Sequence, residues 1–241
     1  MSDHIVKAYD NDLAALKSML SEMGGKAEEQ LSKSIDALIR RDTKLADTVV
    51  KADELLDEME VAIEEKAVLT IAKRQPMAKD LRNIMVAVRI AADLERIGDL
   101  AKNVAKRAHA IDNPIPRRLA TGLERMSQLA QTQLKLVLDA FAADDAERAM
   151  DVWRHDEDID ALYNSIFREL LTYMMEDPRM ISACTHLLFA TKNIERIGDH
   201  ATNIAENIYY LVNGQLLKEQ RPKKDQTSTT PFSFEIGRAH V

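Results

Sequence analysis

Apolar residues recur every three or four positions along most of this chain, which places them on one face of an α-helix. The first such stripe runs from about residue 5 to residue 39 and consists of Leu13, Leu16, Leu20, Met23, Ala27, Leu31, Ile35 and Leu38. The pair Gly24 and Gly25 interrupts the stripe without changing its phase. We therefore expect one long helix with a weak point at the glycines.

Similar stripes, together with residues that start or stop helices, predict five more helices. Asp42 or Thr43 caps a second helix that extends to about residue 74. Pro76 opens a third helix at about 77–110, because proline is tolerated in the first turn. The remaining helices are expected at about 117–142, 146–175 and 179–212.

The two halves of the chain resemble each other. The hexapeptide LERIGD at Leu94–Asp99 returns one hundred residues later as IERIGD at Ile194–Asp199, and the earlier helices repeat at an offset of 103. Such a long period indicates duplication of a whole small domain. We predict an all-α fold of six long antiparallel helices, arranged as two tandem three-helix bundles at residues 1–112 and 115–213.

Composition supports an all-helical fold. Seven glycines and six prolines in 241 residues amount to about 5%, where globular proteins average roughly 12%. A β-sandwich or barrel needs turn residues about every ten positions, so an all-β fold is excluded. Residues 214–241 are polar at first and then unlike the rest, so we predict a disordered tail, and whether 232–241 is native stays open.

Charge and cysteine content indicate the compartment and exclude some partners. The formal net charge is −7, whereas nucleic-acid binders carry basic faces. Cys184 is the only cysteine, which fits a reducing cytoplasm. The first twelve residues lack the apolar core of a signal peptide, and no apolar run approaches the ~20 residues of a membrane span. We therefore expect a soluble, cytoplasmic protein that binds no nucleic acid.

Paired carboxylates carry the strongest chemical signal. The apolar stripe of the third helix leads into Glu95 and Asp99, and that of the sixth helix leads into Glu195 and Asp199. Acids four residues apart on a helix point the same way and repel each other. A bound hard cation would offset this repulsion, because such cations take oxygen ligands.

The second and fifth helices carry a complementary set of acids. Asp53 and Asp57 share one line of the second helix, and Asp156 and Asp160 share one line of the fifth. Antiparallel packing would place each pair opposite the acids of the neighbouring helix. The asparagines one turn further on provide a second tier of metal ligands, Asn103 and Asn203. The alternative is an ordinary solvated face whose acids form salt bridges.

Several catalytic signatures are absent from the sequence. It contains no phosphate-binding loop, no GxGxxG, no HExxH, no CxxC and no GxSxG. None of the six histidines has a glutamate three residues before it, so the Glu-x-x-His signature of ferritin-like di-iron enzymes is missing. A structural or sensory metal site therefore fits better than an enzyme.

The duplicated hexapeptides and their flanks resemble the PhoU family, the accessory regulators of bacterial high-affinity phosphate uptake. The resemblance covers about residues 5–213. The segments that carry it are AKRQPMAKDLR at 72–82, MEDPR at 175–179 and ERIGDHATNIAE at 195–206. This combination is far more specific than any single pair of acids.

The resemblance implies a fold, a site and a role. The fold is two tandem three-helix bundles, and the site is metal bound at E(D)xxxD motifs. The metal in some members is multinuclear iron, and zinc, manganese and magnesium stay open. Carried over by position, the motif pairs are Asp53 with Asp57, Glu95 with Asp99, Asp156 with Asp160, and Glu195 with Asp199.

The role implied by the family is regulatory. Members link the phosphate ABC transporter, through its ATPase subunit, to the histidine kinase of the phosphate response, and they keep that response off when phosphate is ample. They are cytoplasmic, peripheral at the membrane through their partners, and commonly homodimeric. Two alternatives to this interpretation as a non-enzymatic regulator stay open. They are a carboxylate-bridged di-metal enzyme and a metal-free helical scaffold.

Overall fold

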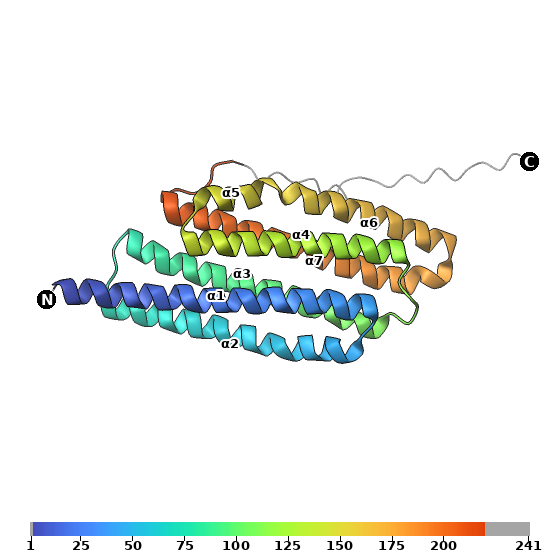
Figure 1. Ribbon diagram of the computed structural model, residues 1–241, viewed down its shortest axis with the longest axis horizontal. Helices are drawn as coiled ribbons and strands as arrows, with labels where there is room; N and C mark the ends of the chain where they lie inside the picture. Colours follow the sequence, from blue (N-terminus) through green and yellow to red (C-terminus); the bar gives the residue numbers. More distant parts are fainter. Residues whose placement is uncertain (1, 220–241) are drawn as a thin grey trace, which may run out of the picture.

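The computed structural model describes residues 2–219, with side chains from Tyr9 onward. Across these residues the chain folds entirely into helices and their connections (Figure 1). The elements are α1 (Ser2–Arg40), α2 (Thr43–Arg74), α3 (Lys79–Lys106), η1 (Arg107–Ala110), α4 (Arg117–Ala143), α5 (Ala146–Arg154), α6 (Asp156–Glu176), η2 (Pro178–Met180) and α7 (Ile181–Asn213). The tail predicted for residues 214–241 lies outside the described chain from residue 220 onward.

Helix boundaries follow the predicted caps in some places and depart from them in others. The side chain of Asp42 accepts a 3.0 Å hydrogen bond from the backbone N–H of Leu45, which caps α2 as expected. In contrast, α3 begins at Lys79 rather than at Pro76. Ala78 has φ 43°, a left-handed backbone angle that no α-helix contains, so the helix cannot begin before it.

The predicted fifth helix is divided into α5 and α6 at His155. The side-chain amide of Gln133, on α4, donates a 3.0 Å hydrogen bond to the backbone oxygen of His155. That carbonyl also accepts from the backbone N–H of Asp158, three residues ahead, as in a tight turn. The prediction of one continuous helix at 146–175 is therefore wrong at this point, because a side chain from another helix interrupts the ladder.

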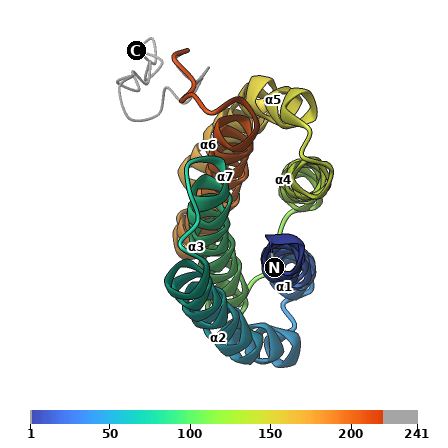
Figure 2. The same ribbon diagram turned by 90° about the vertical axis from the view of Figure 1, so that its left-hand side faces the viewer.

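The helices form two bundles that lie side by side. Helices α1, α2 and α3 pack together, and α4 packs with α5, α6 and α7. The bundles meet where α3 contacts α7 and where α1 contacts α4, as the end-on view in Figure 2 shows. The predicted all-α fold of two tandem three-helix bundles is confirmed.

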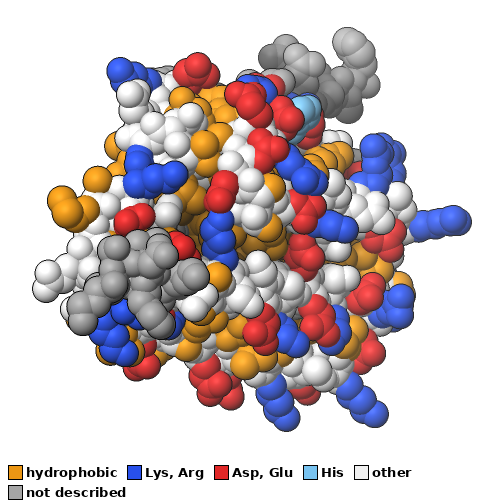
Figure 3. All heavy atoms as spheres, turned by 60° about the vertical axis from the view of Figure 1, so that its left-hand side comes forward, with side chains coloured by type: hydrophobic (Ala, Val, Ile, Leu, Met, Phe, Trp, Pro, Cys, Tyr) orange, Lys and Arg blue, Asp and Glu red, His pale blue; other side chains and the backbone are white. Residues whose placement is uncertain are grey.

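A single apolar cluster extends through both bundles. It includes Leu20 and Leu94 in the first half as well as Leu134 and Ile194 in the second, all fully buried. On the face shown in Figure 3, acidic and basic side chains lie intermingled over the described part of the chain. Among the described helices, none is long and apolar enough to cross a membrane.

Candidate functional site: two acidic clusters

The structure brings the predicted acids together in pairs of neighbouring helices. The first acidic cluster lies between α2 and α3, and the second lies between α6 and α7. The members of the first are Asp53, Asp57, Glu95 and Asp99. Those of the second are Asp156, Asp160, Glu195 and Asp199.

Glycines in the duplicated hexapeptides let the helices approach closely at both clusters. A Cβ on Gly98 would clash with Leu56 of α2 and would lie 3.3 Å from the Oδ1 atom of Asp53. A Cβ on Gly198 would lie 2.7 Å from the Cδ1 atom of Ile159 on α6. A side chain at either position would push the acid-bearing helices apart.

Two side chains satisfy the buried carboxylate of Asp53. The Nζ atom of Lys102 donates to Asp53 and also to the Oδ1 atom of Asp99 at 2.5 Å. The side-chain amide of Gln30, on α1, donates to Asp53 at 2.9 Å and to the backbone oxygen of Gly98 at 3.1 Å. The first cluster therefore joins all three helices of its bundle.

The outer acids of the first cluster influence one another electrostatically. Burial, and then the charge of Asp53, raises the pKa of Asp57 above its ordinary value. Burial, and then the charge of Asp99, raises the pKa of Glu95. Arg96 partly offsets this charge, since its guanidinium lies 3.5 Å from Glu95 and 3.8 Å from Asp99.

The second cluster is more deeply buried. Asp156, Asp160 and Glu195 are each no more than 4% exposed. The hydroxyl of Thr202 donates to Asp156 at 3.1 Å, and the ammonium of Lys192 donates to the Oε1 atom of Glu195 at 3.0 Å. Burial, followed by the charge of Asp199, raises the pKa of Glu195 to about 7.

Two buried oxygens at the second cluster have no hydrogen-bond partner. One is Oε2 of Glu195, and the other is Oε1 of Gln133. Gln133 reaches this region from α4, and its Oε1 atom lies 3.5 Å from where a Cβ on Gly198 would stand. Unsatisfied buried acceptors cost free energy, so a positive ligand would find acceptors ready here.

Neither cluster presents a complete set of metal ligands in this conformation. Within residues 9–219, no three His, Cys, Asp or Glu side chains converge closely enough to hold one metal ion. Metal binding therefore requires carboxylates to rotate toward a common point. Of the second-tier residues, Asn203 donates to Asp93 of α3 at 3.3 Å, across the contact between the bundles, and Asn103 is half-buried on α3.

Sequence reasoning missed the polar partners of the acids, among them Gln30, Gln133 and Lys102. Gln30 and Gln133 are related by the same offset of 103 that relates the early helices, so the repeat carried a signal for them. Lys102 stands where the repeat has Thr202, which is a difference that an alignment of the halves exposes. These residues lie within helices, and no local sequence signal sets them apart from other polar positions.

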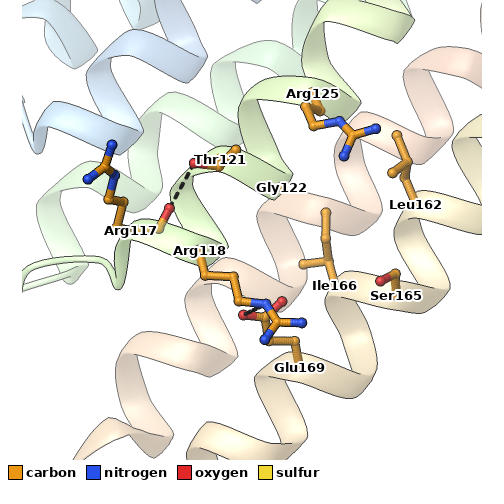
Figure 4. Close-up of a pocket in the computed structure, with 9 residues that line it drawn as sticks. All are labelled: Arg117, Arg118, Thr121, Gly122, Arg125, Leu162, Ser165, Ile166 and Glu169. Carbon is orange, nitrogen blue, oxygen red and sulfur yellow. Dashed lines mark hydrogen bonds and ion pairs between the residues drawn. The ribbon is translucent and has the colours of Figure 1, made fainter.

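A groove between α4 and α6 is the main alternative site (Figure 4). It has a volume of about 560 Å³ and is lined by Arg117, Arg118 and Arg125 among others. Arg118 points toward Glu169, with which it forms a 3.3 Å ion pair. The other two guanidinium groups point in different directions, so the three do not converge on one ligand.

The fold and the clusters define a duplicated all-α protein with an acidic cluster buried between two helices of each half. Comparison with known families gives the same division. A family model described as the PhoU domain matches residues 20–108 and matches a second time at 123–208. The chain belongs to the PhoU family.

Relatives match the chain over nearly its whole length. It is 58% identical to a phosphate-specific transport system accessory protein PhoU homolog of Rhizobium meliloti, over 94% of this chain and 96% of the relative. It is 41% identical to the PhoU accessory protein of Escherichia coli, over 89% of each chain. The crystal structure of PhoU from Pseudomonas aeruginosa matches with a TM-score of 0.80 and 40% identity, over 86% of this chain and 100% of that one.

Proposed function

We propose that this chain is a non-catalytic regulator that keeps the phosphate-starvation response off when phosphate is plentiful. It would do so by linking the ATPase subunit of the phosphate ABC transporter to the sensor histidine kinase, and by modulating phosphate uptake. We place it in the cytoplasm as a homodimer that reaches the membrane through these partners.

The observation that carries the proposal is full-length similarity to named accessory proteins. The Escherichia coli and Rhizobium meliloti relatives are both called phosphate-specific transport system accessory proteins. The two ranges that the family model matches, 20–108 and 123–208, include both acidic hexapeptides. The transporter link rests on those names, whereas the kinase link rests on the role of the family.

We also propose that the protein binds metal through acidic residues of these clusters. Carboxylates suit hard cations such as iron, manganese or magnesium, and zinc also accepts them. The buried, unpartnered Oε2 atom of Glu195 supports this fit in the second cluster. A bound cation would offset the repulsion among the acids and hold α6 against α7. In the first cluster, Lys102 already lies among the carboxylates.

A deletion strain tests the regulatory role. Removal of the gene from its host is expected to raise alkaline phosphatase activity in excess phosphate, and the wild-type gene on a plasmid should restore repression. A plasmid variant with Glu95, Asp99, Glu195 and Asp199 changed to Ala should fail to restore it.

Other outcomes of these experiments would favour other functions. Unchanged alkaline phosphatase activity in the deletion strain would contradict the repressor role. Full repression by the four-alanine variant would favour a metal-free helical scaffold. Substrate turnover or oxygen consumption by metal-loaded protein would favour the carboxylate-bridged di-metal enzyme.

A further inference from the structure

The two acidic clusters differ at one position of the repeat. The duplicated segments align at an offset of one hundred, which pairs Lys102 of α3 with Thr202 of α7. Both side chains contact the aspartate that opens the acidic pair of the neighbouring helix. Lys102 contacts Asp53, and Thr202 contacts Asp156. One contact supplies a full positive charge and the other supplies a neutral hydroxyl.

The ammonium of Lys102 occupies the position of a cation in the first cluster. It bridges Asp53 of α2 and Asp99 of α3, so it joins the two helices that a bound metal would join. Its side chain is only 20% exposed. An ammonium held between two carboxylates keeps its positive charge, because both neighbours favour the charged form.

The second cluster also has a lysine, but its position is different. Lys192 lies one turn before Glu195 on the same helix, and its side chain is 38% exposed. It donates to the Oε1 atom of Glu195 and leaves Oε2 buried without a partner. Among the described residues, no oxygen of the first cluster is buried in this unsatisfied way. The second cluster thus keeps an unused buried acceptor.

We propose that Lys102 closes the first cluster to divalent cations, and that only the second cluster binds one. This inference rests on the proposed metal binding and states which half of the molecule carries it. A divalent ion entering the first cluster must displace a half-buried ammonium from two carboxylates, and it is repelled by that ammonium until it does. At the equivalent position of the second cluster, a divalent ion meets the uncharged hydroxyl of Thr202. The ammonium of this cluster, Lys192, is more exposed than Lys102 and pairs with Oε1 of Glu195, which leaves Oε2 as an acceptor for the ion.

Exchange of the two repeat residues tests the inference. The variants are Lys102→Thr and Thr202→Lys, with Lys106→Thr as a control for loss of an exposed lysine from the same helix. The full chain is stripped with a chelator and titrated with Mn²⁺ alone, and bound ion is counted by equilibrium dialysis with elemental analysis. Thermal unfolding with and without Mn²⁺ gives a second readout that also reports whether each variant folds.

Wild type and Lys106→Thr should bind one Mn²⁺, and Lys102→Thr should bind two. Without metal, Lys102→Thr should melt at a lower temperature than wild type, because Asp53 loses its counter-ion. Addition of Mn²⁺ should raise the melting temperature of this variant again. Thr202→Lys should weaken binding at the second cluster at least tenfold. Addition of Asp99→Asn to Lys102→Thr should remove the second ion, which assigns it to the first cluster.

Two results would overturn the inference. If wild type binds two Mn²⁺ ions of similar affinity and Lys102→Thr changes neither, the clusters are equivalent and Lys102 excludes nothing, while metal binding itself stands. If neither wild type nor Lys102→Thr binds Mn²⁺, the proposed metal binding falls as well. The regulatory role is tested separately by the deletion strain.

Discussion

At the scale of single residues, burial sets the chemistry of the second cluster. Glu195 is 4% exposed, and its pKa of about 7 lies well above its usual value near 4.5. Burial is the main cause, because a charged carboxylate loses solvation between packed helices. The nearby charge of Asp199 adds to the rise. A carboxyl with such a pKa changes its charge within the range of pH that proteins experience.

We predict that the metal-free protein loses stability through Glu195 as the pH rises from about 4.5 to 7. The folded state holds the proton more tightly than the unfolded state, so the stabilising effect is complete below pH 4.5 and is lost as the pH passes 7. A rise of this size corresponds to roughly 3 kcal/mol. Glu195→Gln cannot titrate, so it should match wild type at pH 5 and exceed it in free energy of unfolding at pH 8.

Urea unfolding at both pH values checks this prediction, with Glu124→Gln as the control at an exposed glutamate. A constant difference between Glu195→Gln and wild type at pH 5 and pH 8 would show that Glu195 does not titrate in this interval.

The pattern of residues predicted the acids of the clusters but not their hydrogen-bond partners. Glu95 and Asp99 stand out because an apolar stripe leads directly into them. Gln30, by contrast, is one polar residue on a long helix, and its role depends on a contact with Asp53 that only the packing of α1 on α2 creates. Periodicity identifies which face a residue occupies, and it carries no information about which atoms meet across that face.

At the scale of the helix, the glycine pair of α1 shows two different uses of the same residue. The helix runs unbroken from Ser2 to Arg40, as predicted. Gly24 is buried against α4, where a Cβ would lie 2.7 Å from the Cδ1 atom of Leu138. Gly25 faces open space, with nothing within 4 Å of a Cβ. The first glycine permits contact between the bundles, and the second only lowers helix propensity.

We predict that Gly25→Ala stabilises the protein by about 0.5–1 kcal/mol, which is the usual gain from replacing an exposed helical glycine. Gly24→Ala is the matched variant next to it, and it should give no gain or a loss because Leu138 must move. Urea denaturation midpoints of the two variants and wild type measure the difference. Equal stabilisation by both would mean that α1 and α4 are not in close contact at this point.

The break between α5 and α6 marks the limit of prediction at the helix scale. Sequences signal helix ends through Gly, Pro and capping residues, and Asp42 is such a signal that the structure confirms. His155 and its neighbours contain no glycine or proline. At the break, the amide of Gln133 reaches the backbone oxygen of His155 from a different helix. A tertiary contact of this kind leaves no trace in local periodicity.

At the scale of the whole molecule, the duplicated halves share one core. A small cavity of about 30 Å³ between them is lined by Leu13 and Leu16 of α1, Phe141 of α4 and Leu211 of α7. The ammonium of Lys17 forms a 2.6 Å ion pair with Asp144 and lies over the ring of Phe141. Contacts at this boundary are therefore both apolar and charged, as they are inside a single domain.

We predict that residues 115–213 do not fold stably when produced alone, although the repeat marks them as a unit. Their separation from the first half exposes the faces of α4 and α7 that pack on α1 and α3. Each Å² of apolar surface left exposed costs about 25 cal/mol, and the fragment would lose the part of the shared core that both halves build together. Circular dichroism of the fragment should show reduced helix content and a broad, non-cooperative unfolding curve. Addition of the fragment 1–112 should restore both, since the halves complete each other's core. A fragment that unfolds cooperatively at the midpoint of the whole chain would instead show that the duplication has kept two independent domains.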